Sequence, residues 1–291
     1  MARQIKKKKQ HTISQCYLKS WMDSSGCLWL HDLKKEQTHK HNKTANILQA
    51  SYYYEENSLK PDYRVENILQ DIENRFCPIL KKLHGIFQKY LVYSHALETE
   101  LENYMSKDVQ QIIKEFTNYQ YLRVPGAIKQ KKYELQTTSL PEEQKKYALN
   151  PGRFVDSGFT YTKRNFQSLK MLIHISFGEL FITSDRPCFD VKDSDFSPIL
   201  GEEVGVSSSV ILYIPLSPRF SLLLYPSNYS SYSSLTPEVI FKEASQCVVK
   251  NQNKLVIQIA DRYVIAQKEE DYIYKIASKR KKAFPPFLEM I

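Results

Sequence analysis

Three side chains able to handle a phosphate group lie far apart in this 291-residue sequence. They are His11, Arg123 and Asp185. An imidazole can move a proton near neutral pH, and a carboxyl group can act as an acid or a base. A guanidinium group can hold a phosphate through two parallel hydrogen bonds. We expect these three residues to be catalytic if the folded chain brings them into one cleft.

Four further polar residues stand close to these three in the sequence. Ser184 and Arg186 flank Asp185 where an apolar run ends before Pro187, and strand ends hold polar groups rigidly. The amides of two glutamines could donate hydrogen bonds to an anion. We therefore expect a substrate-binding set made of Gln15, Gln120, Ser184 and Arg186.

Each catalytic candidate also has a structural alternative. The carboxylate of Asp185 could accept hydrogen bonds from backbone amides in a turn. Arg123 could interact with the C-terminus of the helix that is expected to end beside it. His11 could be a core residue whose hydrogen bonds are satisfied. These alternatives stay open at the level of the sequence.

The net charge of +9 adds a preference for polyanions. Much of it lies in two blocks, Lys6 to Lys9 and Lys279 to Lys282. Together with the three catalytic candidates, it predicts a nuclease that cleaves RNA or DNA as a toxin or antiviral-defence effector. Two alternatives are a non-catalytic module that binds nucleic acid or a protein, and an enzyme acting on a nucleotide of the NAD type. A protein partner or regulator encoded in a defence operon is a further expectation.

Metal and cofactor sites are weakly supported. Asp185 could help to hold Mg²⁺, but one carboxylate is little support for a two-metal site. His39 and His41 would share one face of a strand, yet no cysteine or carboxylate stands beside them, so we expect exposed loop histidines. Motifs for dinucleotide, P-loop and metalloprotease sites are missing from the sequence. We expect no dedicated metal site and no certain cofactor beyond a possible Mg²⁺.

The apolar content and the cysteines bear on location. No apolar run is long enough for a membrane span, and the basic N-terminus is followed by polar residues rather than by the apolar stretch of a secretory signal. The five cysteines are widely spaced and form no CxxC pair. We expect a cytoplasmic protein with free thiols and no contact with a membrane.

The elements that would position the candidate site follow from hydrophobic periodicity. Apolar residues recur at three- and four-residue steps between 62 and 125, which predicts long helices, with a kink at Pro78. Short β-type runs lie on both sides of this region. We expect one α+β domain whose mostly antiparallel sheet, built from both ends of the chain, packs on the central helices. Its parts are a basic tail (1–10), a β-rich part (11–54), a helical part (62–125), a polar insertion (127–165), a β-rich part with a late helix (166–275) and a second basic tail (276–291).

Several segments of the sequence resemble, in order, the motifs of one protein family. Residues 11–21 resemble its His-x-x-Pro-Gln-x-Tyr-Leu-x-x-Phe start, and residues 26–32 resemble its Gly-x-Leu-Trp-x-Tyr-Asp strand. Residues 120–125 and 181–187 are similar to its Gln-x-x-Arg-x-Pro and Thr-Ser-Asp-Asn-Pro motifs. Later matches are Pro-Leu-Ser-Pro at 215–218 and the closing Asn-rich helix and strand at 251–266. Taken together, these segments resemble a domain-of-unknown-function family, the one numbered 4238.

Two departures from the family pattern affect the candidate site. Ser14 stands where the family has proline, and Arg186 stands where it has asparagine, which adds a positive charge beside Asp185. The family has no agreed activity. The resemblance therefore implies a site but no reaction.

Overall fold

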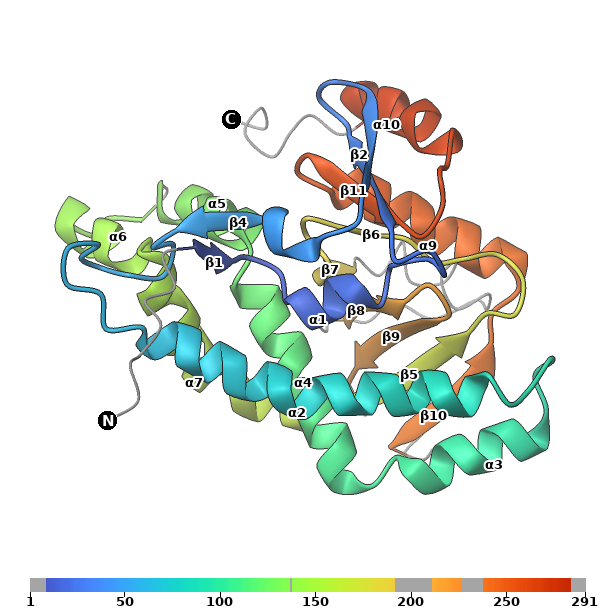
Figure 1. Ribbon diagram of the computed structural model, residues 1–291. Coiled ribbons are helices and arrows are strands. Elements are labelled where there is room, and N and C mark those ends of the chain that lie inside the picture. The colour runs from blue at the N-terminus through green and yellow to red at the C-terminus, as the bar shows by residue number, and fades with distance from the viewer. Residues whose placement is uncertain (1–8, 137, 192–210, 227–237, 284–291) are drawn as a thin grey trace.

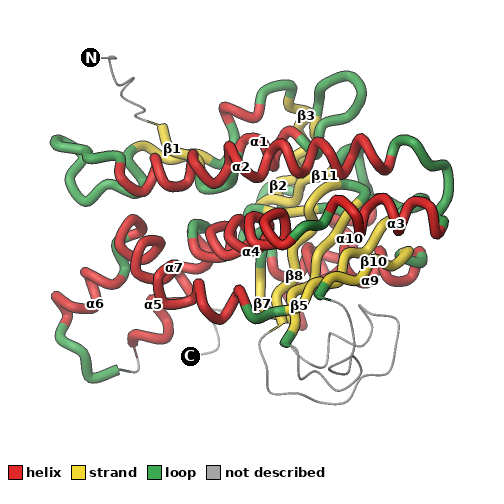
Figure 2. Tube along the Cα trace, turned by 90° about the horizontal axis from the view of Figure 1, so that it is seen from below, coloured by secondary structure: helices red, strands yellow, loops and turns green. Residues whose placement is uncertain are grey.

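The computed structural model describes residues 9–136, 138–191, 211–226 and 238–283. It confirms the predicted α+β class, with long helices packed on mostly antiparallel sheets (Figure 1). The strands of the largest sheet lie between two groups of helices (Figure 2). On one side lie α2 (Arg64–Phe87), α3 (His95–Tyr104) and α4 (Lys107–Leu122), and on the other lie α9 (Gln246–Ile259) and α10 (Tyr272–Ala283).

The central helices follow the predicted apolar spacing. Ser94 and Ser106 are the N-caps of α3 and α4, and each side chain accepts a hydrogen bond from a backbone amide of the first turn. The predicted kink at Pro78 does not divide the region, because α2 continues on both sides of the proline. Phe76 and Leu80, which flank Pro78, are both buried, so packing on each side holds the helix together despite the missing amide donor.

The five-stranded sheet has the order β10-β5-β9-β8-β7, and only the β10–β5 pair is parallel. Alternate side chains of β5 point to opposite faces: Ile173 packs toward the α2 side, and Leu172 toward α9 and α10. All six residues of β5 and of β9 are buried, as expected for central strands covered on both faces. The bounds are β5 Lys170–Ile175, β7 Phe189–Val191, β8 Ile211–Ser217, β9 Phe220–Tyr225 and β10 Val239–Glu243.

A four-stranded antiparallel sheet joins the two ends of the chain in the order β3-β2-β11-β6. Strand β11 near the C-terminus pairs with β2 near the N-terminus, so the prediction that both ends share a sheet is confirmed. A separate two-stranded sheet pairs β1 with β4. The bounds are β1 Lys9–His11, β2 Leu28–Asp32, β3 Gln37–His41, β4 Gln49–Ser51, β6 Thr183–Ser184 and β11 Tyr263–Ala266.

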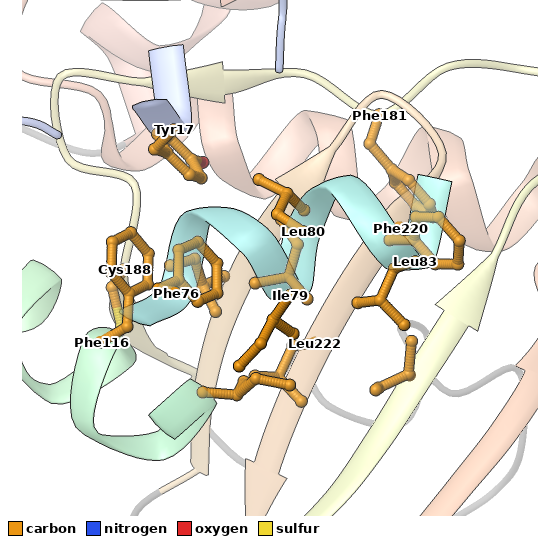
Figure 3. Packing of buried hydrophobic residues seen from close by; sticks show 14 of the residues in the cluster. Tyr17, Phe76, Ile79, Leu80, Leu83, Phe116, Phe181, Cys188, Phe220 and Leu222 are labelled. Atoms are coloured by element: carbon orange, nitrogen blue, oxygen red, sulfur yellow. The ribbon is translucent and has the colours of Figure 1, made fainter. Parts of the chain in front are cut away.

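The short helix α1 (Gln15–Lys19) connects the first strand to the main core. Figure 3 shows Tyr17 above Phe76 of α2, with Phe116 of α4 stacked on Phe76 at a centroid distance of 3.6 Å. The hydroxyl of Tyr17 contacts Thr183 Oγ1 at 2.7 Å and donates to the carbonyl oxygen of Pro215 at 2.5 Å. These contacts fix α1 between the central helices and the late strands.

Next to this core, α1 is bonded covalently to α2. Cys16 and Cys77 form a disulfide whose Cα atoms lie 6.0 Å apart. The expectation of free thiols is therefore wrong for these two residues and holds for Cys27, Cys188 and Cys247. The sequence could not reveal the pair, because 61 residues separate its members and only the packing of α1 on α2 brings them together.

The polar insertion at 127–165 is helical. It is folded into the end of α5 (Pro125–Gln136), α6 (Glu142–Ala148) and most of α7 (Pro151–Gln167). The last of these packs on α4, where Phe159 stacks on Tyr119 at 4.0 Å. Here Gly158 faces Leu122 so closely that an added Cβ would lie 2.9 Å from its Cδ2. The polar, lysine-rich composition of this segment gave little helical periodicity, yet its last helix, α7, packs with the central helices.

The ends of the chain also differ from the expected basic tails. Lys9 already belongs to β1, and α10 continues to Ala283; the remaining residues of both predicted tails lie outside the described residues. The late helix expected within 166–275 is α9, which follows strand β10 and begins after Ser245, its N-cap residue. Among the helices that the structure describes, none has the length and apolarity needed to cross a bilayer.

Candidate functional site

Arg123 is the centre of a buried hydrogen-bond network at the end of α4. Its side chain is only 3% exposed. Nη1 donates to Glu73 Oε1 at 2.6 Å and to Gln120 Oε1 at 3.2 Å, and Nη2 donates to the backbone oxygen of His11 at 2.6 Å. Nε donates to the hydroxyl of Tyr54 at 3.3 Å. Each nitrogen of the guanidinium group thus has a protein partner.

The electrostatics of Arg123 fit this internal role. Burial opposes the charge of the guanidinium group, but Tyr54 and Glu73 more than offset it and raise the pKa of Arg123 above its ordinary value. The fork that would grip a phosphate is occupied by a carboxylate, a carbonyl and a hydroxyl. Arg123 therefore ties α4 to α2 and to the first strand of the chain.

His11 and Gln15 lie beside this network. Gln15 Nε2 lies 3.3 Å from His11 Nδ1, and His11 Nε2 lies 3.2 Å from the carbonyl oxygen of Ala45. Both residues are partly exposed, whereas Gln120 is completely buried. The Nε2 atom of Gln120 has no hydrogen-bond partner within the described part of the chain. Of the predicted site residues around Arg123, His11 and Gln15 are thus accessible to solvent, whereas Gln120 is not.

Asp185 organises the turn that leads into β11. Its Oδ1 accepts from the amide of Asp261 at 2.9 Å, and its Oδ2 accepts from the amides of Arg262 at 2.8 Å and Tyr263 at 3.0 Å. Burial raises the pKa of Asp185 to about 6, and the nearby Asp261 carboxylate adds to this, while the three amides act in the opposite direction. The turn-forming role that the sequence left open is the one that the structure supports.

Ser184 and Arg186 are positioned by the same strand end. The buried Ser184 accepts from the amide of Arg186 at 3.1 Å, and Ser184 pairs with Val264 in the sheet. Arg186 extends across Gly126, where an added Cβ would lie 3.1 Å from Cδ of Arg186. It would also lie 3.0 Å from Oδ2 of Asp261, so the side chains of Arg186 and Asp261 would have to shift by a few tenths of an ångström to accommodate a side chain at this glycine.

The three chain segments that carry the predicted site therefore come together. The first strand contacts the end of α4 through Arg123, and the start of α5 contacts the tip of β6 through Gly126. Lys129 of α5 adds an ion pair with Asp261 at 3.3 Å. The side chains of Arg123 and Asp185, however, belong to two separate internal networks. The structure brings the segments together but does not aim these two groups into a shared opening.

Several residues of this junction were not singled out from the sequence. Tyr54 and Glu73 hold Arg123, and Tyr121 donates to Asp190 Oδ2 at 2.9 Å. No motif marks them, because their partners lie 50 or more residues away in the chain. Only Glu73 could have been noticed in the sequence, because it is an acidic residue next to Ile72 and near Phe76, which belong to the buried apolar stripe of α2.

A second surface carries exposed basic and aromatic side chains. In the hairpin β2–β3, Lys40 Nζ lies over the ring of Trp29 at 5.4 Å from its centroid. The next cross-strand pair on this face, His31 and Thr38, contacts α10: Thr38 Oγ1 lies 2.8 Å from the hydroxyl of Tyr274. Exposed lysines follow in the hairpin turn and along α10, namely Lys34, Lys35, Lys275 and Lys279.

No metal centre is found in the part of the chain that the structure describes: no three His, Cys, Asp or Glu side chains are grouped closely enough to hold an ion. His39 and His41 do lie together on β3, with ring centroids 6.3 Å apart. Their backbone partners on β2 are Leu30 and Leu28, which supply no further ligand.

Comparison with known proteins agrees with the order of the motifs. A family model described as "Protein of unknown function (DUF4238)" matches residues 9–270. No curated protein and no solved structure matches the chain. Because the match includes every element from β1 to β11, the chain belongs to the DUF4238 family.

Proposed function

We propose that this protein binds nucleic acid through the surface formed by α10 and the hairpin β2–β3. The observation that carries the proposal is the anchoring of α10. Ile273 and Ala277 are buried against the sheet, and Tyr274 contacts Thr38 of β3. The helix continues from this anchor into the sequence Lys279-Arg280-Lys281-Lys282. A block of positive charge on a firmly seated helix is suited to contact with phosphates.

The aromatic residue of the hairpin supports single-stranded nucleic acid as the ligand. Trp29 is partly exposed, and Lys40 Nζ lies over one face of its ring. Bases of any sequence stack on aromatic rings, and lysines next to the ring contact the backbone. The acidic residues Glu269 and Asp271 precede α10, so they lie at the opposite end of the helix from its basic block.

Binding without turnover is favoured over catalysis by the state of the predicted catalytic residues. Arg123 and Asp185 are held by internal partners. An anion clamp needs donors that face the ligand, and the donors of Arg123 face Glu73, Gln120, Tyr54 and the His11 carbonyl. A cytoplasmic location belongs to the same proposal, and it requires that the Cys16–Cys77 disulfide persist in a reducing compartment.

The test is the salt dependence of binding to a labelled single-stranded RNA or DNA, measured by fluorescence anisotropy. The variant Lys275→Glu/Lys279→Glu changes two exposed lysines of α10 and should reduce the magnitude of the negative slope of log K against log[salt] by about 1.4, because two phosphate contacts are lost. The variant Lys81→Glu/Lys250→Glu changes two exposed lysines on α2 and α9 and serves as the charge-matched control. Equal slopes for the two variants, or no binding at low salt, would remove the proposal.

Metal-independent cleavage is a second candidate, and it rests on His11. Its imidazole is partly exposed, is oriented by Gln15 and lies next to the Arg123 network. Incubation of the protein with total RNA, tRNA and plasmid, with and without Mg²⁺, tests this reading. Cleavage that disappears in His11→Gln but persists in the control Lys81→Glu/Lys250→Glu would support it, and intact substrates under all conditions would exclude it.

A further inference from the structure

A cavity lies between α5, α6 and the start of α7, away from both surfaces discussed above. Its volume is about 760 Å³, within the range of small-molecule sites. In Figures 1 and 2 these helices lie at one end of the molecule, beside the strands β1 and β4. A second hollow of about 310 Å³ shares Glu143, Lys146 and Asn150 with the first, so the two adjoin.

The charges of the cavity favour an anion. Lys132 of α5 and Lys145 and Lys146 of α6 line it. Lys145 pairs with Glu142 at 3.0 Å, whereas Lys132 and Lys146 are exposed and form no ion pair among the described residues. Of the acidic side chains, Glu142 is thus neutralised by Lys145, and Glu56 in the adjoining hollow is neutralised by Arg153. Among the described acidic residues that line the two hollows, Glu143 is therefore the one without an ion-pair partner. The two unpaired lysines, Lys132 and Lys146, outnumber it, so the lining carries a net positive charge.

The start of α7 adds to this field. Asn150 is its N-cap and lines both hollows; Pro151 has no amide hydrogen and the amide of Arg153 donates to Asn150 Oδ1, so the helix contributes the positive field of its dipole rather than a set of free amide donors. The helix start is held rigidly, because Gly152 lies against the backbone of Tyr54 so closely that an added Cβ would be 2.1 Å from the Tyr54 oxygen. A rigid wall of this kind is suited to holding a ligand in one position.

The remaining lining is apolar and aromatic. Leu135 and Leu149 line the large hollow, and Leu135 is only 5% exposed. In the smaller hollow Tyr147 is 58% exposed and carries Arg153 over its ring at 3.5 Å. A ligand that fits this lining has phosphate groups for the lysines and a flat ring for the two leucines.

We propose that this cavity binds a nucleoside phosphate, with the phosphates at Lys132, Lys146 and the start of α7 and the base against Leu135 and Leu149. The site is distinct from the nucleic-acid surface on α10 and does not depend on it. It is also connected to the Arg123 network, because Tyr54 contacts Gly152 through its backbone and Arg123 through its hydroxyl.

The experiment is isothermal titration of the full-length protein with ATP, inorganic triphosphate and adenosine. We expect ATP to bind at least tenfold more tightly than either of the other two probes, because only ATP satisfies both parts of the cavity. The variant Lys132→Glu/Lys146→Glu should weaken ATP binding at least tenfold, and the charge-matched Lys81→Glu/Lys250→Glu should bind ATP as the parent does.

Three outcomes would overturn the proposal. They are no binding of ATP, ATP binding that Lys132→Glu/Lys146→Glu leaves unchanged, and triphosphate binding as tight as ATP binding, which would indicate a simple anion site. A melting curve of each variant, with a midpoint close to that of the parent protein, shows that the variant is folded and that the loss of binding is local.

Discussion

Arg123 donates a hydrogen bond from Nη2 to the backbone oxygen of His11 at 2.6 Å, and so fastens the end of α4 to the first strand. Two residues predicted to meet around a substrate meet each other instead. The contact uses the guanidinium of one and the carbonyl of the other, which leaves the His11 side chain on the partly exposed edge of this corner.

We predict that Arg123→Lys lowers the free energy of unfolding by about 3 kcal/mol, because a lysine cannot serve the partners on both sides and leaves buried polar groups without bonds. Urea unfolding of Arg123→Lys and of the control Arg75→Lys measures this. Arg75 is 41% exposed in its ion pair with Glu115, so its loss should cost less than about 1 kcal/mol. Equal effects of the two changes would contradict a structural role for Arg123.

The pKa of Asp185 should depend on Asp261. Burial and the Asp261 carboxylate raise the pKa of Asp185 to about 6, so Asp261→Asn should bring it closer to the ordinary value near 3.8. A carboxyl NMR titration of the parent and of Asp261→Asn measures both values. Because the folded pKa lies above the unfolded one, the contribution of Asp185 to stability is complete below about pH 4 and is lost as the pH rises through 6. A pKa that Asp261→Asn does not move would show that burial alone is responsible.

His174 should make the protein less stable in acid. Gln252 Oε1 accepts from Ser221 at 2.7 Å and from Tyr213 at 3.1 Å, so the amide nitrogen of Gln252 donates to His174 Nδ1 at 2.8 Å. A protonated imidazole could not accept this bond, and burial lowers the pKa of His174 to about 3.

The sign follows from the depressed pKa. The unfolded chain binds a proton at His174 below about pH 6.5 and the folded chain does not, so stability is lost as the pH falls from 6.5 toward 3, by about 2 kcal/mol at pH 5. Unfolding curves at pH 7.5 and pH 5 for the parent and His174→Asn give the difference. The variant should lose about 2 kcal/mol less than the parent over this interval, and an equal loss in both would show that His174 does not titrate as described.

Reduction of the Cys16–Cys77 disulfide should destabilise the protein by up to about 4 kcal/mol, the loop-closure estimate for residues this far apart in sequence. Thermal unfolding with and without reductant, in the parent and in Cys16→Ser/Cys77→Ser, checks this. The parent should respond to reductant and the double variant should not. The control Cys247→Ser removes an exposed free thiol and should leave the response intact.

The sequence by itself determined the α+β class, the helical middle and the order of the family motifs, because periodicity and motif order are local or nearly local signals. It also placed polar groups at the correct element ends. Tertiary structure alone decided what those groups contact. Arg123 donates to Glu73, and Asp185 accepts from the amides of residues 261–263. These partners lie 50 or more residues away in the sequence, and no sequence pattern indicates them.

The same reason explains the disulfide, the helical insertion and the cavity. Cys16 meets Cys77, and Phe159 meets Tyr119, only because α1 and α7 pack on the central helices. A hydrophobic pattern indicates which face of a helix or strand will be buried, but it does not indicate which other element will cover that face. That choice depends on the combined packing of all the helices and sheets, which no single segment of the sequence contains.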